Sequence, residues 1–135
     1  IMRTGEALAL VKPTATVMEA ALAMTNSKGG SAIVVDRAGK LAGIFTDGDL
    51  RRVVATGKDQ ASPTAAVGCR LSAVLEAPVS RYMTKSPSFV YSDAYAAELL
   101  KVFEKKRIDD LPVCDRKGKV VGLVDLQDLP KMKVM

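Results

Sequence analysis

Thr46 and Asp49 lie where an apolar strand, predicted over residues 41–45, runs into a helix. Thr-x-x-Asp at such a junction is typical of a capping box, in which the side chains satisfy free backbone N–H groups. The same helix N-terminus attracts phosphate, because its N–H groups and its dipole both favour negative charge. Asp49 could also accept two hydrogen bonds from a ribose diol, with Arg51 and Arg52 adding positive charge nearby. Two interpretations stay open: a plain capped helix, or one end of a nucleotide site.

This strand–turn–helix stretch occurs twice in the chain. Residues 11–50 align with residues 90–129 without a gap, at a shift of 79 positions. The clearest match pairs Ala-Ile-Val-Val-Asp-Arg at residues 32–37 with Leu-Pro-Val-Cys-Asp-Arg at residues 111–116. Two copies of a unit that cannot bury its own apolar face are expected to pack against each other. The repeat therefore predicts a pseudo-two-fold axis and two related clefts between the halves.

Each repeat carries the same predicted order of elements, strand–helix–strand–strand–helix. Such an order favours mixed sheets with helices on one side, so we predict an α+β fold. A stretch rich in small and polar residues separates the two copies and is interpreted as a linker, with a short helix expected at residues 71–77, before Pro78. The predicted division is repeat 1 at residues 1–57, the linker at 58–78, and repeat 2 at 79–135.

The ends of the first helix in each repeat have local signals. Thr16 and Glu19 are spaced as a capping box, and the two glycines at residues 29–30 are expected to end the helix that it opens. In the second repeat, Ser92 or Asp93 is expected to cap the corresponding helix.

The composition argues against several classes of function. The chain has 135 residues, the size of one ordinary domain, and no histidine. Histidine is the most common general base and metal ligand, so we expect no enzyme chemistry, metal or required cofactor within this segment. Cys69 and Cys114 are too few and too far apart for a disulfide framework or a zinc site, and are expected to be buried free thiols.

Charge and hydropathy limit the kinds of partner that the chain is expected to bind. The net charge of +5 suits anionic ligands. Nucleic acid is not expected, because aromatic residues make up only 4% of the chain and no Lys/Arg stripe forms one face. No apolar run approaches membrane-spanning length and no secretory pattern opens the chain, so we expect no membrane contact and a cytoplasmic location. Because the chain begins at Ile1, we expect it to be part of a longer polypeptide.

The two units resemble a tandem pair of CBS domains, also called a Bateman module. The resemblance rests on Leu-Pro-Val-Cys-Asp at residues 111–115 and on Gly-Ile-Phe-Thr-Asp-Gly-Asp at residues 43–49, and it covers essentially the whole chain. It implies two pseudo-two-fold related β-α-β-β-α units, which commonly form homodimers through their helices.

A narrower resemblance is to the C-terminal region of bacterial D-arabinose 5-phosphate isomerases, in which a sugar-isomerase (SIS) domain precedes a CBS pair. It rests on Gly-Ile-Phe-Thr-Asp-Gly-Asp-Leu-Arg-Arg at residues 43–52 and on Thr-Gly-Glu at residues 4–6. Those enzymes supply the synthesis of Kdo for lipopolysaccharide or capsule. The resemblance implies that an isomerase active site would lie in an upstream SIS domain, in a tetrameric full-length protein.

In CBS pairs, the Thr or Ser and the Asp of one repeat face the first strand and the segment before the proline of the other. Carried over to this chain, Asp49 would bind a ribose diol, and Thr46 with the helix N-terminus would bind a phosphate. Arg51 or Arg52 would support the phosphate. The second repeat would complete this cleft with Ser88, Ile108, Asp109, Asp110 and Leu111. The two aspartates would disfavour a polyphosphate unless they point outward.

The resemblance implies a second cleft, related to the first by the repeat. It would be formed by Asp125, Asp128, Gly29, Gly30 and Ser31. Asp125 stands where Thr or Ser is usual, and a second carboxylate repels phosphate unless a cation intervenes. We expect this cleft to be empty or altered in specificity.

Three functions follow from the resemblance and stay open at this point. The module would bind a small-molecule nucleotide and regulate an arabinose 5-phosphate isomerase, with CMP-Kdo, the activated end product of the pathway, as the candidate ligand. Alternatively, it would only dimerise and hold catalytic domains together. A third function is energy sensing through the adenine nucleotides AMP or ATP.

Overall fold

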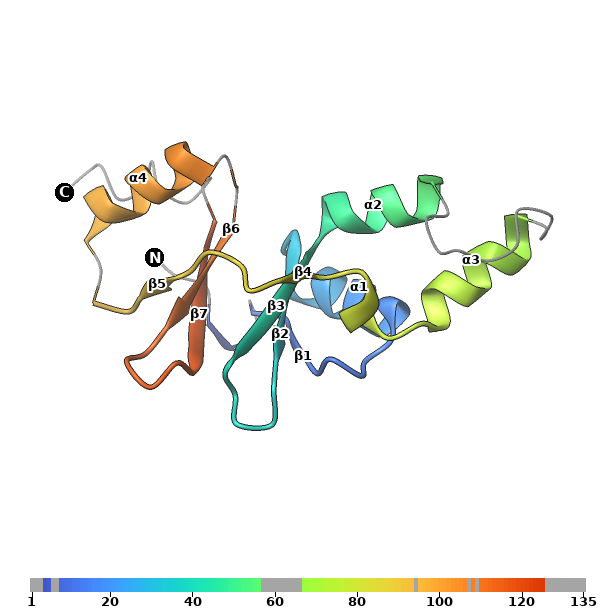
Figure 1. The fold of residues 1–135 in the computed structure, drawn as a ribbon, viewed down its shortest axis with the longest axis horizontal. Helices are drawn as coiled ribbons and strands as arrows, with labels where there is room; N and C mark the ends of the chain where they lie inside the picture. The colour runs from blue at the N-terminus through green and yellow to red at the C-terminus, as the bar shows by residue number, and fades with distance from the viewer. Residues whose placement is uncertain are drawn as a thin grey trace.

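The computed structural model describes residues 4–5, 8–56, 67–93, 95–106, 108 and 110–125. The strands form two sheets, which Figure 1 shows side by side, ordered β1-β2-β3-β4 and β5-β6-β7. The strands are β1 (Leu10–Val11), β2 (Ser31–Val35), β3 (Leu41–Thr46), β4 (Thr84–Lys85), β5 (Val90–Tyr91), β6 (Asp110–Cys114) and β7 (Val120–Asp125). The helices are α1 (Val17–Ser27), α2 (Asp47–Thr56), α3 (Val67–Glu76), α4 (Ala96–Lys106) and a short 3-10 helix, η2 (Val79–Arg81).

The two sheets repeat one topology, as the internal alignment predicts. β1 runs parallel to β2 and β2 antiparallel to β3, and β5, β6 and β7 pair in the same way. Both hairpins shift register one residue before the end of their first strand, between Val34 and Val35 and between Val113 and Cys114. The α+β fold with two β-α-β-β units is therefore confirmed for the described residues. The final helix expected in the second repeat lies outside them.

The two hairpin turns are built alike. The Asp36 carboxylate accepts hydrogen bonds from the backbone N–H groups of Ala38 and Lys40, at 2.9 and 3.0 Å. Gly39 closes the turn at φ 81°, a left-handed conformation that side chains disfavour. Asp115 and Gly118 repeat this arrangement in the second hairpin, where the glycine φ is 90°.

Each repeat has an apolar core between its sheet and its first helix. The first core consists of Ala9, Val17, Ala20, Met24, Ala32, Val34, Phe45 and Val79. The second consists of Val90, Leu99, Phe103, Leu111, Val113 and Val124. Side chains alternate along a strand, so Ile33 and Ile44 point away from the first core. Both are nevertheless buried, which shows that the second sheet face is covered as well.

Residues 79 positions apart meet at both ends of the interface between the repeats. Ser31 donates a hydrogen bond to the carboxylate of Asp110, its equivalent in the second repeat. At the hairpin end, Lys40 and its equivalent Lys119 form an antiparallel bridge, and the N–H of Val120 donates to the Gly39 carbonyl at 3.0 Å. These contacts define the predicted pseudo-two-fold axis.

The capping box that opens α1 is present, and the helix ends directly before the glycine pair that was expected to end it, although neither glycine takes the left-handed position. Thr16 accepts from the Glu19 N–H at 3.1 Å, and the Glu19 carboxylate accepts from the Thr16 N–H at 3.4 Å. The left-handed residue at the C-terminus is Lys28, at φ 57°, and not a glycine of the pair at 29–30. Gly29 instead follows the cap and donates its N–H to the Met24 carbonyl at 3.1 Å.

The predicted cap of α4 is wrong. The helix begins at Ala96, too far along the chain for Ser92 or Asp93 to hold the cap position. The Asp93 carboxylate forms an ion pair with Arg116 at 2.8 Å instead. The carboxylate that the local sequence predicted as a helix cap therefore pairs with the guanidinium of Arg116 in the neighbouring hairpin.

The helix expected at residues 71–77 is confirmed as α3, which begins earlier than expected, whereas the strand β4 was not predicted. α3 occupies residues 67–76, inside the range expected to be a linker, whose first part, 58–66, lies outside the described residues. β4 pairs with β3 in the first sheet, although its residues fall in the predicted second repeat. Figure 1 shows the chain crossing from β4 in the first sheet to β5 in the second. The division between the repeats at residues 78 and 79 stays a prediction.

Within the described ranges, no helix is both long and apolar enough to cross a membrane.

Candidate ligand-binding cavity

A cavity of about 910 Å³ lies between the two repeats. The first repeat contributes the C-terminal end of α1, the end of β3 and the first turn of α2. The second repeat contributes the segment after β4, the start of β6 and the end of β7. The lining residues are 28–30, Ile44, 46–49, Arg51, Arg52, Thr84, 86–88, Ile108, Asp110, Pro112 and Asp125.

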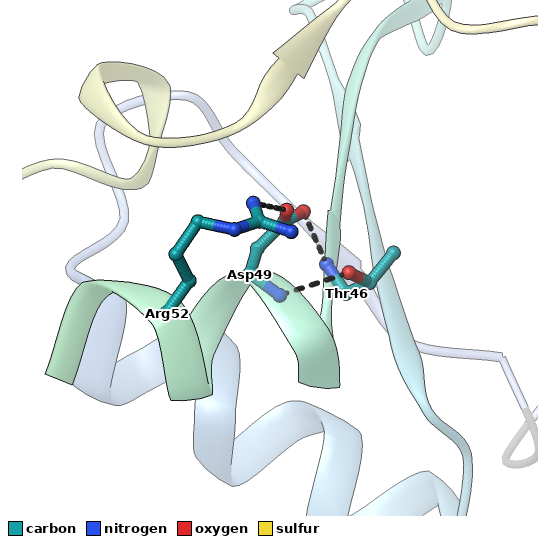
Figure 2. A network of polar contacts seen from close by, with 3 residues as sticks. All are labelled: Thr46, Asp49 and Arg52. Atoms are coloured by element: carbon teal, nitrogen blue, oxygen red, sulfur yellow. Dashed lines mark hydrogen bonds and ion pairs between the residues drawn. The ribbon is translucent and has the colours of Figure 1, made fainter. Parts of the chain in front are cut away.

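The Thr46–Asp49 capping box is fully formed at the edge of this cavity. The Asp49 N–H donates to Thr46 Oγ1 at 3.1 Å, and the Thr46 N–H donates to Asp49 Oδ2 at 3.0 Å. Arg52 Nη1 lies 3.0 Å from Asp49 Oδ1. Figure 2 shows the Asp49 carboxylate between the Thr46 backbone and the Arg52 guanidinium. Its orientation is thus fixed from two sides.

This geometry leaves the Asp49 carboxylate able to bind a ligand. Each carboxylate oxygen has about two acceptor positions, so the bonds to Thr46 and Arg52 do not exhaust them. The Asp49 side chain retains 13% of its surface exposed. Beside it, Gly48 has no side chain to cover the N-terminus of α2, where the helix dipole favours an anion. The arrangement can accept hydrogen bonds from a diol and place a phosphate near the helix end.

The charges along the cavity are nearly balanced. The described lining carries three cationic side chains, of Lys28, Arg51 and Arg52, and four carboxylates. Arg51 forms an ion pair with Asp47 at 2.7 Å, and both groups are largely exposed. The described lining therefore has one net negative charge, unlike the strongly basic surface that a polyphosphate prefers.

Most of the residues that were expected in two separate clefts line this one cavity. Thr46, Asp49, Arg51, Arg52, Ser88, Ile108 and Asp110 come from the first expected cleft, and Gly29, Gly30 and Asp125 from the second. Asp110 does not point outward. It lies in the wall and accepts the hydrogen bond from Ser31.

Four expected site residues are not in the described lining. Leu111 is fully buried in the second core, and Ser31 is 1% exposed beneath Asp110. Asp109 and Asp128 lie outside the described residues.

Two lining residues that the sequence did not predict have unusual backbones. Lys28 and Ser86 have positive φ angles of 57° and 48°, although neither is a glycine. Glycine, asparagine and aspartate are the residues that most often adopt this conformation, so the residue types at positions 28 and 86 did not predict it. Asp47 and Gly48 were also missed as lining residues, although they stand within the motif itself.

The described part of the chain offers no group of three His, Cys, Asp or Glu side chains that could hold a metal ion.

Known proteins share both the sequence and the fold. The family model described as "CBS domain" matches residues 1–56 and 79–131. The chain is 35% identical over 135 residues to arabinose 5-phosphate isomerase KdsD of Pseudomonas aeruginosa, and 32% identical over 128 residues to isomerase GutQ of Escherichia coli. These matches cover 100% and 95% of the chain but only 37% and 35% of those isomerases. The chain thus spans just over a third of the length of these relatives.

Solved structures agree on the fold. CBSX2, a CBS-pair protein from Arabidopsis thaliana solved in complex with AMP, superposes with a TM-score of 0.77 at 22% identity, covering 98% of this chain and 92% of that one. The CBS domain pair of protein MJ0100, solved with 5′-methylthioadenosine and S-adenosyl-L-methionine, gives 0.78 at 21% identity, with 99% and 92% covered. At such identities these likenesses support the architecture alone. Repeat, topology and family model agree, and the chain belongs to the CBS domain family as a tandem pair.

Proposed function

We propose that this CBS pair binds a nucleotide-containing metabolite in its cavity and thereby regulates an arabinose 5-phosphate isomerase of which it is a part. The observation that carries the proposal is the Asp49 carboxylate, held by Thr46 and Arg52 at a helix N-terminus inside the cavity. The ligand's ribose diol would bind Asp49, and its phosphate would lie at the N-terminus of α2.

A ligand in this position would touch both repeats. One wall of the cavity comes from α2 and the other from the start of β6 and the end of β7. A ligand that contacts both walls favours the arrangement of the repeats that fits it, which is the physical basis of regulation by binding.

The isomerase assignment rests on the two curated relatives. Their lengths leave room for a separate catalytic domain, and we propose that the active site lies in an SIS domain outside this chain. The free thiol of Cys114 supports the cytoplasmic location that we propose for the protein.

CMP-Kdo is the ligand that we propose first, because it carries a ribose and a single phosphate and would report the output of the isomerase pathway. Adenine ligands are the second candidates. AMP in CBSX2, and S-adenosyl-L-methionine in MJ0100, support them.

Apolar side chains on two helices favour assembly as a second function. Met18 and Leu22 are one turn apart on α1 and are 43% and 54% exposed, and Val54 on α2 is 48% exposed. Burying such side chains against a second copy would stabilise a homodimer, and with it a tetramer of the full-length protein.

Calorimetry tests the binding of a ligand to the proposed site. The chain is titrated with CMP-Kdo, CMP, AMP, ATP and S-adenosylmethionine, beside Asp49→Ala and a control, Asp93→Ala. Asp93 is an exposed aspartate of the second repeat that lies outside the described lining. We expect at least one nucleotide to bind, at least tenfold more weakly to Asp49→Ala and unchanged to Asp93→Ala.

Binding that is unchanged in Asp49→Ala would overturn the proposed site. Silence across the panel at millimolar ligand would overturn ligand sensing. Assembly is then tested by sedimentation of Leu22→Glu, which should shift a dimer toward monomer.

A further inference from the structure

Two equivalent cross-strand pairs in the repeats differ in charge. In the first sheet, Ser31 at the start of β2 lies opposite Thr46 at the end of β3. In the second sheet, Asp110 and Asp125 occupy the same register. One repeat thus presents two hydroxyl groups where the other presents two carboxylates.

The two pairs meet at one cavity. Thr46, Asp110 and Asp125 all line it, and Ser31 donates a hydrogen bond to Asp110. The capped N-terminus of α2, which suits phosphate, therefore belongs to the same space as a wall that carries two carboxylates.

The charges of the lining bear on how many phosphates a ligand could carry into the cavity. One phosphate can lie at the end of α2, near Arg51 and Arg52, which already form ion pairs with Asp47 and Asp49. Further phosphates would extend toward Asp110 and Asp125, in a cavity whose described lining carries one net negative charge. Repulsion between close charges is strong where solvent is partly excluded.

We propose that Asp110 and Asp125 make the cavity selective for nucleotides with a single phosphate. Nucleoside triphosphates are rejected by the same two carboxylates. The inference rests on the proposed function, since it assigns the ligand class of that site.

Matched nucleotide pairs test this selectivity. The chain is titrated calorimetrically with AMP and ATP, and with CMP and CTP, without Mg²⁺ and at constant ionic strength. We expect the monophosphate of at least one pair to bind tenfold or more tightly than its triphosphate. Asp125→Thr, which copies the residue at position 46, and Asp125→Asn, which removes only the charge, should each reduce that preference at least threefold.

The double variant Asp110→Ser/Asp125→Thr reproduces the hydroxyl pair of the first repeat and should reduce the preference at least tenfold. Asp93→Asn removes a carboxylate outside the described lining and should leave the preference unchanged. Thermal melts confirm that each variant is folded. If the double variant fails to fold, the single Asp125→Asn variant tests whether the carboxylate causes the preference for the monophosphate.

Each failure has a distinct signature. A triphosphate that binds the unaltered chain as tightly as its monophosphate overturns the selectivity but leaves nucleotide binding intact. A preference that the Asp125 variants do not change, or that Asp93→Asn changes equally, overturns the role of the carboxylate pair. If no nucleotide binds the unaltered chain, the proposed function fails and the selectivity fails with it.

Discussion

At the scale of single residues, capping and binding by Asp49 are compatible. Its carboxylate accepts from the Thr46 N–H at 3.0 Å and pairs with Arg52 at 3.0 Å, which fixes its orientation before any ligand arrives. A group held in this way loses little conformational freedom on binding. The capped helix, one of the two alternatives that the sequence left open, is therefore compatible with the nucleotide site that we propose.

Cys114 illustrates how burial changes a residue's chemistry. Its side chain is 1% exposed at the end of β6, and burial, with the neighbouring Asp115 carboxylate, raises the pKa of its thiol above the ordinary value of 9.0. A folded-state pKa above the unfolded one means that this thiol favours folding while it is protonated. The contribution is lost as the pH rises through the unfolded pKa toward the folded one.

We therefore predict that unfolding free energy falls more steeply between pH 8 and pH 10 with Cys114 than with Cys114→Val, which copies the equivalent Val35. Both chains carry Cys69→Ser, so that one thiol is compared. Urea denaturation at each pH measures the two slopes. Parallel slopes would show that Cys114 titrates alike in the folded and unfolded chains.

At the scale of elements, the first sheet depends on close packing of β3 against β4. A Cβ atom on Gly43 would lie 2.5 Å from Met83 Sδ and 2.8 Å from the Thr84 carbonyl oxygen. The methionine side chain can move, but the carbonyl belongs to the backbone of the paired strand. The lack of a side chain at Gly43 is thus what lets β4 join the sheet.

Gly43→Ala is therefore expected to destabilise the chain by about 1–3 kcal/mol, through overpacking in a buried contact. The matched control is Gly48→Ala in the first turn of α2, where the nearest atom, Thr46 Oγ1, is 3.7 Å from the added Cβ. It should be neutral or stabilise by up to about 1 kcal/mol. Urea midpoints measure both changes, and equal effects would mean that β4 moves away without cost.

At the scale of the whole molecule, the repeats are joined by contacts between equivalent residues. The Ser31–Asp110 hydrogen bond lies at the cavity end of the pseudo-two-fold axis, and the Lys40–Lys119 bridge lies at the hairpin end. A pseudo-symmetric contact pairs like with like unless the repeats have diverged. Serine and aspartate have diverged into a complementary pair, whereas the two lysines place like charges beside each other.

We predict that Lys119→Glu stabilises the chain by up to about 1 kcal/mol, since it replaces like charges with opposite ones across the bridge. The gain should be larger at low salt than at high salt, because exposed charges are screened. Lys117→Glu, which makes the same charge change two residues earlier in the same turn, is the control. An equal gain from both variants would assign the effect to net charge rather than to the contact between the repeats.

The sequence by itself determined the local features and the fold class. The repeat at 79 positions, the alternating strands and the turn glycines predicted two β-α-β-β-α units, and both Thr-led capping boxes formed as their spacing indicated. These features depend on residues a few positions apart, whose geometry the backbone dictates. Thr46 and Asp49 could be singled out for the same reason.

Tertiary packing decided the rest. Residues of both expected clefts line one cavity, and Ser31 donates a hydrogen bond to Asp110. β4 packs against Gly43, and Asp93 forms an ion pair with Arg116 instead of capping α4. Each outcome depends on groups far apart in the chain that compete for the same polar partner or the same space. No local spacing encodes that competition, so it is settled only when the two repeats pack.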